Sequence, residues 1–353
     1  MTSSSAVDEP MPSAEDEQSA AEVRELVGKI LGSVGSSGEA WLQLADSGLT
    51  LAGVPEAAGG SGGSILHAAA VLESVAACGF DLPLVESTWL AAWVAARSSQ
   101  QVPSGPVTFA IAHDATIVDD LPGGSRLRGV TVVPRYQGIA EAHILVPDAG
   151  VVAVIPLDTG SDAAALASGE LVLDHRIDDV RCHAVPDPQG MVAEAALRAG
   201  LARTVQIAGA AGTVRDLAVR YAAQRQQFGR PLSKNQVIQH YLAQVAAEAH
   251  AVRTAARSAV RAWAERGVAA AGTVRAAKAV AGLSVEPCTR LAHQVFGAIG
   301  TTREHELHRY TMAMWAWRDD AGSEFEHGQA IGAAALGVSE DPWTWLINEG
   351  ERE

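Results

Sequence analysis

Apolar residues recur at helical spacing near the start of the chain. Val23, Leu26, Val27, Ile30 and Leu31 fall on one stripe of a helix. Similar spacing dominates from about residue 20 to about residue 96. The pattern therefore predicts a helical N-terminal region.

A longer apolar face predicts the main helix of the C-terminal half. From about Ser233, apolar residues follow one another at intervals of three or four: Ile238, Leu242, Val245, Ala249, Val252, Ala256, Val260 and Trp263. Two flanking helices are predicted, from Leu197 to about Gln226 and from Val268 to about Val295. Pro287 is expected to kink the second of these. This part of the chain is expected to form a four-helix bundle.

Between the helical regions, the pattern changes to short β-branched runs. These runs are Val107–Ile111, Val130–Val133, Ile144–Val146 and Val151–Ile155, with turn residues between them. A small antiparallel sheet or barrel is expected here. The predicted fold class is therefore mostly α with a small middle β-domain.

These patterns divide the chain into four segments. Residues 1–19 are rich in Ser, Pro, Asp and Glu, and we expect a disordered tail. An N-terminal helical domain is predicted at 20–103, a middle β-domain at 104–188 and a C-terminal helical bundle domain at 189–353.

Composition narrows the class of protein. The 353 residues include 26 basic and 41 acidic side chains, and this balance argues against a nucleic-acid-binding protein. The three cysteines (Cys78, Cys182 and Cys288) are too widely spaced for a disulfide framework or a zinc site. No apolar run reaches the roughly 20 residues of a membrane span. We therefore expect a soluble, cytoplasmic protein with no metal.

Charge is unevenly distributed along the chain. From Arg203 to Arg275 there are 11 basic and 3 acidic residues, whereas from Glu304 to Glu353 there are 11 acidic and 3 basic ones. A positive groove for a phosphorylated ligand or cofactor is one interpretation. The solvated faces of long helices are the other, and counts alone favour it.

A turn between two predicted helices carries unusual chemistry, in the sequence RQQFGRPL. Gly229 and Pro231 end the first helix, which places Arg225, Gln227 and Phe228 at its end. Guanidinium and amide groups beside one aromatic ring suit a pyrophosphate and an adenine ring. A purely structural corner between two helices explains the same residues, and both interpretations stay open.

Taken in order, several segments resemble the acyl-CoA dehydrogenase family. RQQFGRPL and NQVIQH, followed by a long helical stretch and QVFGAIGTTREHELHRY, are similar to its C-terminal domain. LTLAGVPEAAGGSGGS is similar to its first helical domain. The resemblance covers roughly residues 20–335. It implies an N-terminal helical domain, a middle β-domain and a C-terminal four-helix bundle through which subunits pair.

The resemblance also implies FAD at a subunit interface. Arg225, Gln227 and Phe228 would contact the ADP half of an FAD bound mainly to a neighbouring subunit. The same pocket would also include Leu232, Asn235 and Gln236, with Gln294 and Gly297 on the adenosine side from the other subunit. Ala298 stands where the family has a second glycine.

The family's reaction is the α,β-dehydrogenation of an acyl-CoA thioester. A carboxylate removes the α-proton and a hydride leaves the β-carbon for the flavin. The usual position of that carboxylate falls on Arg318, which cannot accept a proton. An alternative position falls near Ala199 and Gly200. The catalytic base is therefore unknown, and Asp319 is a candidate if the loop shifts by one residue.

The family's Thr-Glu-Pro-x-x-Gly-Ser loop, which holds the flavin ring, is also missing, and Val107–Asp114 occupies its place. These losses predict the accessory subunit of an α2β2 heteromeric acyl-CoA dehydrogenase. The expected substrate within the family resemblance is a CoA thioester with a bulky acyl group, such as a steroid side chain. Three alternatives stay open: a self-sufficient homo-oligomeric enzyme, a non-catalytic helical interaction protein, and a related flavoenzyme with different chemistry.

Overall fold

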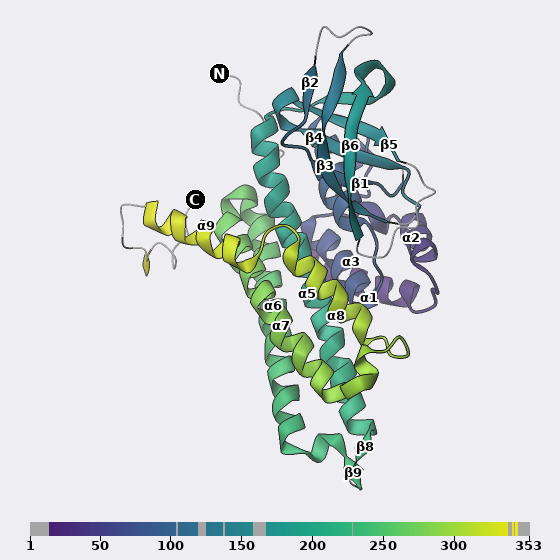
Figure 1. Cartoon of the computed structure of the whole chain (residues 1–353), viewed down its shortest axis with the longest axis vertical. Helices are drawn as coiled ribbons and strands as arrows, with labels where there is room; N and C mark the ends of the chain where they lie inside the picture. The colour runs from purple at the N-terminus through teal and green to yellow at the C-terminus, as the bar shows by residue number, and fades with distance from the viewer. Residues whose placement is uncertain are drawn as a thin grey trace. The chain divides into compact units, whose positions relative to one another are not determined.

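The fold is seen in a computed structural model of the whole chain (Figure 1). The structure describes residues 14–103, 105–118, 125–136, 138–157, 167–227, 229–337, 341 and 343–344. Contacts between residues group the chain into two compact units, of which one is Met1–Gly35, Ser64–Phe80 and Gly200–Glu353, and the other is Ser36–Gly63 and Asp81–Ala199. The domain boundaries predicted after residues 103 and 188 stay predictions, because these units do not follow the order of the chain.

The first unit is helical. Its elements are α1 (Ala14–Leu31), α3 (Ile65–Ala77), the larger part of α5 (Pro188–Gln224), α6 (Gln236–Arg266), α7 (Ala271–Phe296), α8 (Leu307–Asp319) and α9 (Glu324–Gly337). Helices α5, α6 and α7 run side by side in Figure 1. On α6, the predicted apolar face is buried from Val245 to Trp263. Pro287 lies inside α7.

Helix α1 begins earlier than the sequence suggested. Residues 1–13 of the predicted tail lie outside the described residues, but residues 14–19 are helical, so that part of the prediction is wrong. Acidic side chains in the first turn, from Glu15 to Glu17, interact favourably with the positive end of the helix. Val27 and Leu31 are buried as predicted, whereas Leu26 is exposed.

Helix α5 approaches α3 closely at one glycine. A Cβ atom built on Gly209 would lie 2.3 Å from the carbonyl oxygen of Glu73. The Thr213 hydroxyl donates to the carbonyl oxygen of Ala77 at 2.8 Å, one turn further along α5. The absence of a side chain at Gly209 therefore permits this helix crossing.

The second unit combines short helices with two sheets. Its helical elements are α2 (Ser37–Asp46), the single turns η1 (Leu49–Leu51) and η2 (Glu56–Ala58), the π-helix η3 (Val85–Ala92) and α4 (Trp93–Arg97). One sheet has the order β1-β4-β5-β7, from Thr108–Ile111, Glu141–Val146, Val151–Pro156 and Arg181–Ala184. The other has the order β2-β3-β6, from Thr116–Val118, Arg126–Arg135 and Ala167–Arg176.

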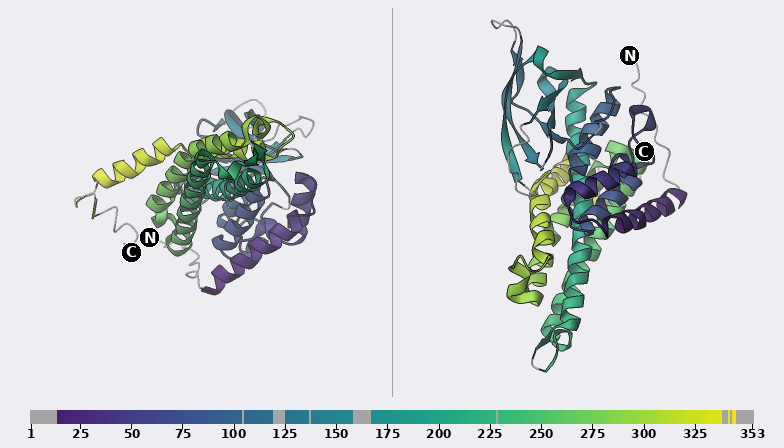
Figure 2. Two further views of the ribbon diagram at one scale, coloured as in Figure 1. Left: turned by 90° about the horizontal axis from the view of Figure 1, so that it is seen from below. Right: turned by 90° about the vertical axis from the view of Figure 1, so that its right-hand side faces the viewer.

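The sheets face each other across one apolar core. The right-hand view of Figure 2 shows the strands in two layers. Residues of both sheets, among them Ile144, Ile155, Leu127 and Leu173, are buried in one cluster. The expected fold class, mostly α with a small middle β region, is confirmed.

Strand pairing departs from the sequence prediction in one respect. Strand β1 pairs with β4 in parallel, with Thr108 opposite Ala142, so the expectation of a purely antiparallel sheet is wrong. Parallel pairing needs a long connection, and here β2 and β3 lie between the two strands in sequence. The sequence pattern also missed β2, β6 and β7. Val172 of β6 is exposed, so this strand lacks a run of buried β-branched residues.

The stretch Gln236–Thr301 contains a window that is long and apolar enough to cross a membrane, judged by length and composition alone. This is weak evidence, because the core helices of a bundle pass the same test and 44% of the window is buried inside the fold. Among the residues that the structure describes, no group of three or more His, Cys, Asp or Glu could hold a metal ion.

Candidate functional site

The turn between α5 and α6 is a short β-hairpin. Helix α5 ends at Gln224, and the backbone is closed by a hydrogen bond from the Leu232 N–H to the carbonyl oxygen of Arg225, at 2.8 Å. Strands β8 (Gln226–Gln227) and β9 (Arg230–Pro231) pair within this loop. The side chains of Arg225 and Gln227 are exposed, and Phe228 lies outside the described residues.

The start of α6 adds amide groups beside this hairpin. Asn235 caps the helix, because its side-chain oxygen accepts a hydrogen bond from the Val237 N–H at 3.0 Å. That contact uses the oxygen and not the NH2 group, which stays a donor. Gln236 is exposed and Leu232 is half-buried.

The end of α7 lies at the same end of the bundle. The Tyr221 ring, one turn before Arg225, stacks on Phe296 with 4.3 Å between ring centroids. Gly297 follows with φ +63° and ψ −148°, a conformation that favours glycine, and open space surrounds the position of its missing Cβ. Gln294 is exposed. The fold thus brings the RQQFGRPL turn and the start of the QVFGAIGTTREHELHRY segment to one place in a single chain.

These residues fit an anionic nucleotide. Arg225 supplies a guanidinium fork, while Gln227, Asn235 and Gln236 supply amide donors, all on exposed side chains. An open approach at Gly297 admits a flat ring close to the backbone. The donor set suits the ADP half of FAD, the cofactor that the family binds.

The position of the expected catalytic base carries a cation instead. Arg318, in the last turn of α8, forms an ion pair with Glu324, with 3.2 Å between Nε and Oε2. Its guanidinium also lies 5.0 Å from the centroid of the Trp315 ring. Asp319, the candidate base, has a side chain that is 73% exposed and lies 3.7 Å from Arg318. An exposed, paired carboxylate lacks the apolar surroundings that tune a general base.

The next acid, Asp320, is held in an ion pair. Its Oδ2 lies 2.6 Å from Nε of Arg203, and its Oδ1 accepts from the Ala321 N–H at 2.9 Å. Burial raises the pKa of Asp320, but the charge and hydrogen bond of Arg203 and the Ala321 N–H outweigh it and lower the pKa overall. Asp320 therefore stays ionised and bound to Arg203 near neutral pH, which makes it a poor proton acceptor.

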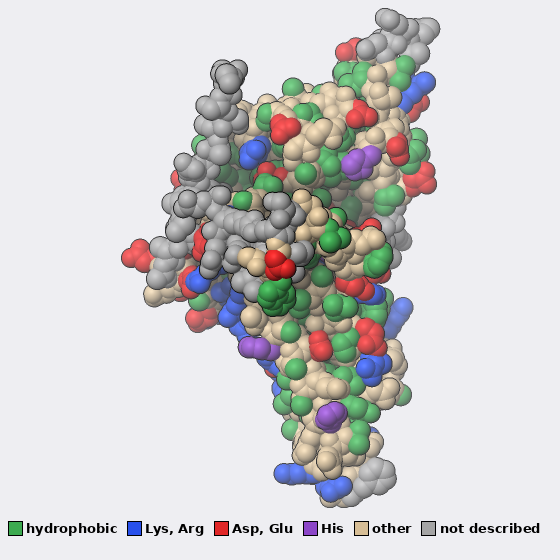
Figure 3. All heavy atoms as spheres, turned by 90° about the vertical axis from the view of Figure 1, so that its left-hand side faces the viewer, with side chains coloured by type: hydrophobic (Ala, Val, Ile, Leu, Met, Phe, Trp, Pro, Cys, Tyr) green, Lys and Arg blue, Asp and Glu red, His purple; other side chains and the backbone are tan. Residues whose placement is uncertain are grey.

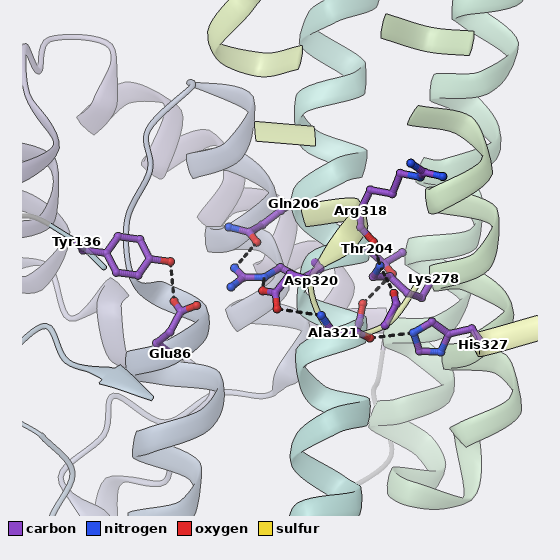
Figure 4. A network of polar contacts seen from close by, with 12 residues as sticks. Glu86, Tyr136, Thr204, Gln206, Lys278, Arg318, Asp320, Ala321 and His327 are labelled. Carbon is purple, nitrogen blue, oxygen red and sulfur yellow. Dashed lines mark hydrogen bonds and ion pairs between the residues drawn. The ribbon is translucent and has the colours of Figure 1, made fainter. Parts of the chain in front are cut away.

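A buried lysine holds the loop that contains these acids (Figure 4). Lys278 of α7 is fully buried, and its ammonium donates to the carbonyl oxygens of Arg318 at 2.7 Å and Gly322 at 2.8 Å. The His327 ring is hydrogen-bonded to the carbonyl oxygen of Ala321 at 2.9 Å. Side chains of α7 and α9 therefore hold the loop between α8 and α9, through the carbonyl oxygens of Ala321 and Gly322.

Burial lowers the pKa of Lys278 to about 8, an effect that the negative charges of Asp320 and Glu324 partly offset. Lys278 was not among the residues predicted from the sequence. A signal was present, because Lys278 lies one turn after Val274 and just before Ala281 on the apolar face of α7.

A buried acid, Glu86, was also not recognised from the sequence. Glu86, on the π-helix η3, is 1% exposed and accepts a hydrogen bond from the Tyr136 hydroxyl at 2.9 Å. It lies in the run LPLVESTWLAAWV, where a single acid among apolar residues was the available signal. The segment Val107–Asp114, where the family has its flavin loop, contains the buried strand β1.

Comparison with known proteins agrees with this fold. Residues 15–101 match the acyl-CoA dehydrogenase N-terminal domain, and residues 192–324 match the acyl-CoA dehydrogenase C-terminal domain. The acyl-CoA dehydrogenase FadE34 of Mycobacterium tuberculosis is 32% identical over 282 residues, which are 76% of this chain and 38% of that protein. The chain therefore spans well under half the length of this relative.

Two solved structures have closely similar folds. The ChsE4–ChsE5 complex of Mycobacterium tuberculosis has a TM-score of 0.76 at 21% identity, covering 93% of this chain and 99% of that one. The Tcur3481–Tcur3483 steroid ACAD has a TM-score of 0.75 at 22% identity, covering 95% and 99%. The chain belongs to the acyl-CoA dehydrogenase family of flavoprotein oxidoreductases.

Proposed function

We propose that this chain is the accessory subunit of a heteromeric acyl-CoA dehydrogenase. In this assembly it completes the ADP pocket of an FAD that is bound mainly to a partner subunit. The partner supplies the catalytic carboxylate. One contrast carries the proposal: the nucleotide-binding donors are exposed at one end of the bundle, whereas the position of the base holds Arg318.

The exposure of the donors favours a pocket that a second chain completes. Arg225, Gln227, Asn235 and Gln236 all project from one end of the bundle in the single chain. Polar donors without a protein wall around them bind a nucleotide weakly, because water competes for each hydrogen bond. A partner subunit packed over this end would exclude that water and enclose the ADP group.

The acids near the end of α8 support the proposal that a partner subunit supplies the catalytic carboxylate. Asp319 is exposed, and Asp320 is paired with Arg203. Removal of an α-proton needs a carboxylate that is free to accept it and desolvated enough to be basic. Bound FAD supplies the hydride acceptor in the family's reaction. The carboxylate is therefore assigned to the partner.

The compared structures support a two-chain assembly and a bulky substrate. One is described as the ChsE4–ChsE5 complex, and the other as a variant of the Tcur3481–Tcur3483 steroid ACAD. By analogy, we assign to this assembly an acyl-CoA thioester whose acyl group is large, such as a steroid side chain. The free cysteines of the chain suit the cytoplasm, where we place it.

Co-expression tests the assignment of the subunit. We expect the chain purified alone to contain little flavin and to lack acyl-CoA oxidation with a dye acceptor. Co-purification with a genomically adjacent dehydrogenase that has an intact base should give a yellow, active complex. A yellow, active homomer would instead show that the chain is self-sufficient, and the proposal would be wrong.

Arg225→Ala tests the nucleotide pocket. In the purified complex, we expect the flavin content to fall several-fold, because a charge-assisted contact to the pyrophosphate is lost. Flavin absorbance per protein measures this. Arg215→Ala is the matched control, since Arg215 lies on the helix that leads into the hairpin and pairs with Asp216 at 2.8 Å. Equal flavin content in both variants would mean that the hairpin is only a structural corner.

A further inference from the structure

The helical unit contains a cavity that the proposed function does not use. It has a volume of about 590 Å³ and lies among α1, α3, α5 and α6. This volume is within the range of small-molecule sites. Of the cavity's arginines on α6, Arg253 is the nearest in sequence to the hairpin. It lies about 25 Å along the helix from Gln236, where α6 begins beside the hairpin. The cavity and the nucleotide pocket are therefore separate sites.

Three arginines form a stripe on one wall of the cavity. Arg253, Arg257 and Arg261 are spaced by four residues on α6, so they lie on one face over about 12 Å. Arg24 of α1 adds a fourth guanidinium. Figure 3 shows one face of the molecule on which Lys and Arg side chains gather beside a few acidic ones.

The acids in the cavity do not balance these cations. Glu73 pairs with Arg24 at 2.8 Å and lies 3.8 Å from Arg253, and Glu17 pairs with Arg261. Among the described residues, no carboxylate lies within ion-pair distance of Arg257. Burial and the positive charges of Arg253 and Arg24 lower the pKa of Arg257, although Glu73 opposes this. The wall thus has a surplus cation that a bound anion would stabilise.

The remaining lining is mostly apolar and small. It comprises Ala20, Ala21, Leu66, Ala69, Val205, Ala208, Ala256 and Val260, together with the two hydroxyl-bearing residues Thr254 and Ser258. Such a surface binds hydrocarbon and gives no reason for the arginines to gather. A ligand that satisfies both surfaces has anionic groups at one end and an apolar portion at the other.

We propose that this cavity binds a phosphorylated organic ligand, with its phosphate groups on Arg253, Arg257 and Arg261 and its apolar part over the alanine and valine lining. Guanidinium groups suit phosphate because their donors form two parallel hydrogen bonds to its oxygens. A phosphate site at these arginines would account for part of the excess of basic residues between Arg203 and Arg275. The proposal does not depend on the flavin pocket.

Titration calorimetry on the full chain tests the site, with inorganic pyrophosphate as the anion probe. We expect saturable binding that weakens as NaCl is raised. Arg257→Ala should weaken it by about tenfold or more, and Arg257→Lys should restore part of the loss. Arg290→Ala should leave it unchanged, because Arg290 does not line the cavity. Hexyl phosphate should bind more tightly than methyl phosphate, which tests the apolar lining.

Three results would overturn the proposal. The first is the absence of saturable binding by either phosphate ester or pyrophosphate. The second is an equal loss of affinity in Arg290→Ala, which would indicate non-specific attraction to the surface. The third is binding to the isolated chain that disappears in its purified assembly, which would assign the arginines to contact with a protein partner.

Discussion

Replacing Lys278 with methionine is expected to lower the free energy of unfolding by about 3 kcal/mol. The ammonium is fully buried and donates to the carbonyl oxygens of Arg318 and Gly322. Methionine has a similar length but no donor, so both carbonyls lose a partner. The acids Asp320 and Glu324 also lose a nearby positive charge. Urea unfolding followed by circular dichroism at pH 7 measures the change.

The same lysine gives a pH dependence with a defined sign. Because burial lowers its pKa to about 8 from 10.5, the folded state loses the proton before the unfolded state does. Below pH 8 Lys278 keeps its proton in both the folded and the unfolded state, and the buried positive charge lowers the stability of the folded state. Between about pH 8 and 10.5 the unfolded state binds more protons, so the stability of the wild type should rise relative to that of Lys278→Met.

Lys29→Met is the control for both measurements. Lys29 is exposed and pairs with Glu25 one turn away, and such surface pairs contribute little. We expect a change below about 0.5 kcal/mol and no difference in pH dependence. Equal stability of Lys278→Met and Lys29→Met would show that the loop between α8 and α9 is held by other contacts.

Gly209→Ala is expected to destabilise the helical unit by about 2–3 kcal/mol, even though alanine favours helix. The new methyl group would lie 2.3 Å from the carbonyl oxygen of Glu73, so α3 and α5 must separate. A backbone atom cannot move aside as the end of a flexible side chain can. The melting temperature and the urea midpoint should both fall.

Gly212→Ala provides the matched control on the same helix. Nothing lies within 4 Å of the position of its missing Cβ, so the substitution meets open space. We expect it to stabilise the chain by about 0.5–1 kcal/mol through helix propensity alone. A loss of stability of the same size in both variants would mean that the helix crossing does not depend on the glycine.

How far the sequence predicts the fold depends on whether an element is specified by local periodicity. The apolar face of α6 was read correctly because a buried stripe repeats every three or four residues, and Val245 to Trp263 are buried as predicted. Strand β6 was missed because its outward-facing Val172 is exposed and its partners lie far away in the sequence. The parallel pairing of β1 with β4 depends on a connection that no local pattern records.

Some features of the candidate site were likewise visible in local sequence, and others depended on contacts between distant residues. Local sequence was enough to indicate the family and the two segments around Arg225 and Gln294, because glycines and polar residues at helix ends leave a recognisable signature. Only the tertiary structure brought Tyr221 onto Phe296, paired Asp320 with Arg203 and buried Lys278 beneath the α8–α9 loop. These contacts join residues far apart in the chain, and their energies depend on distance and burial, which exist only once the helices have packed.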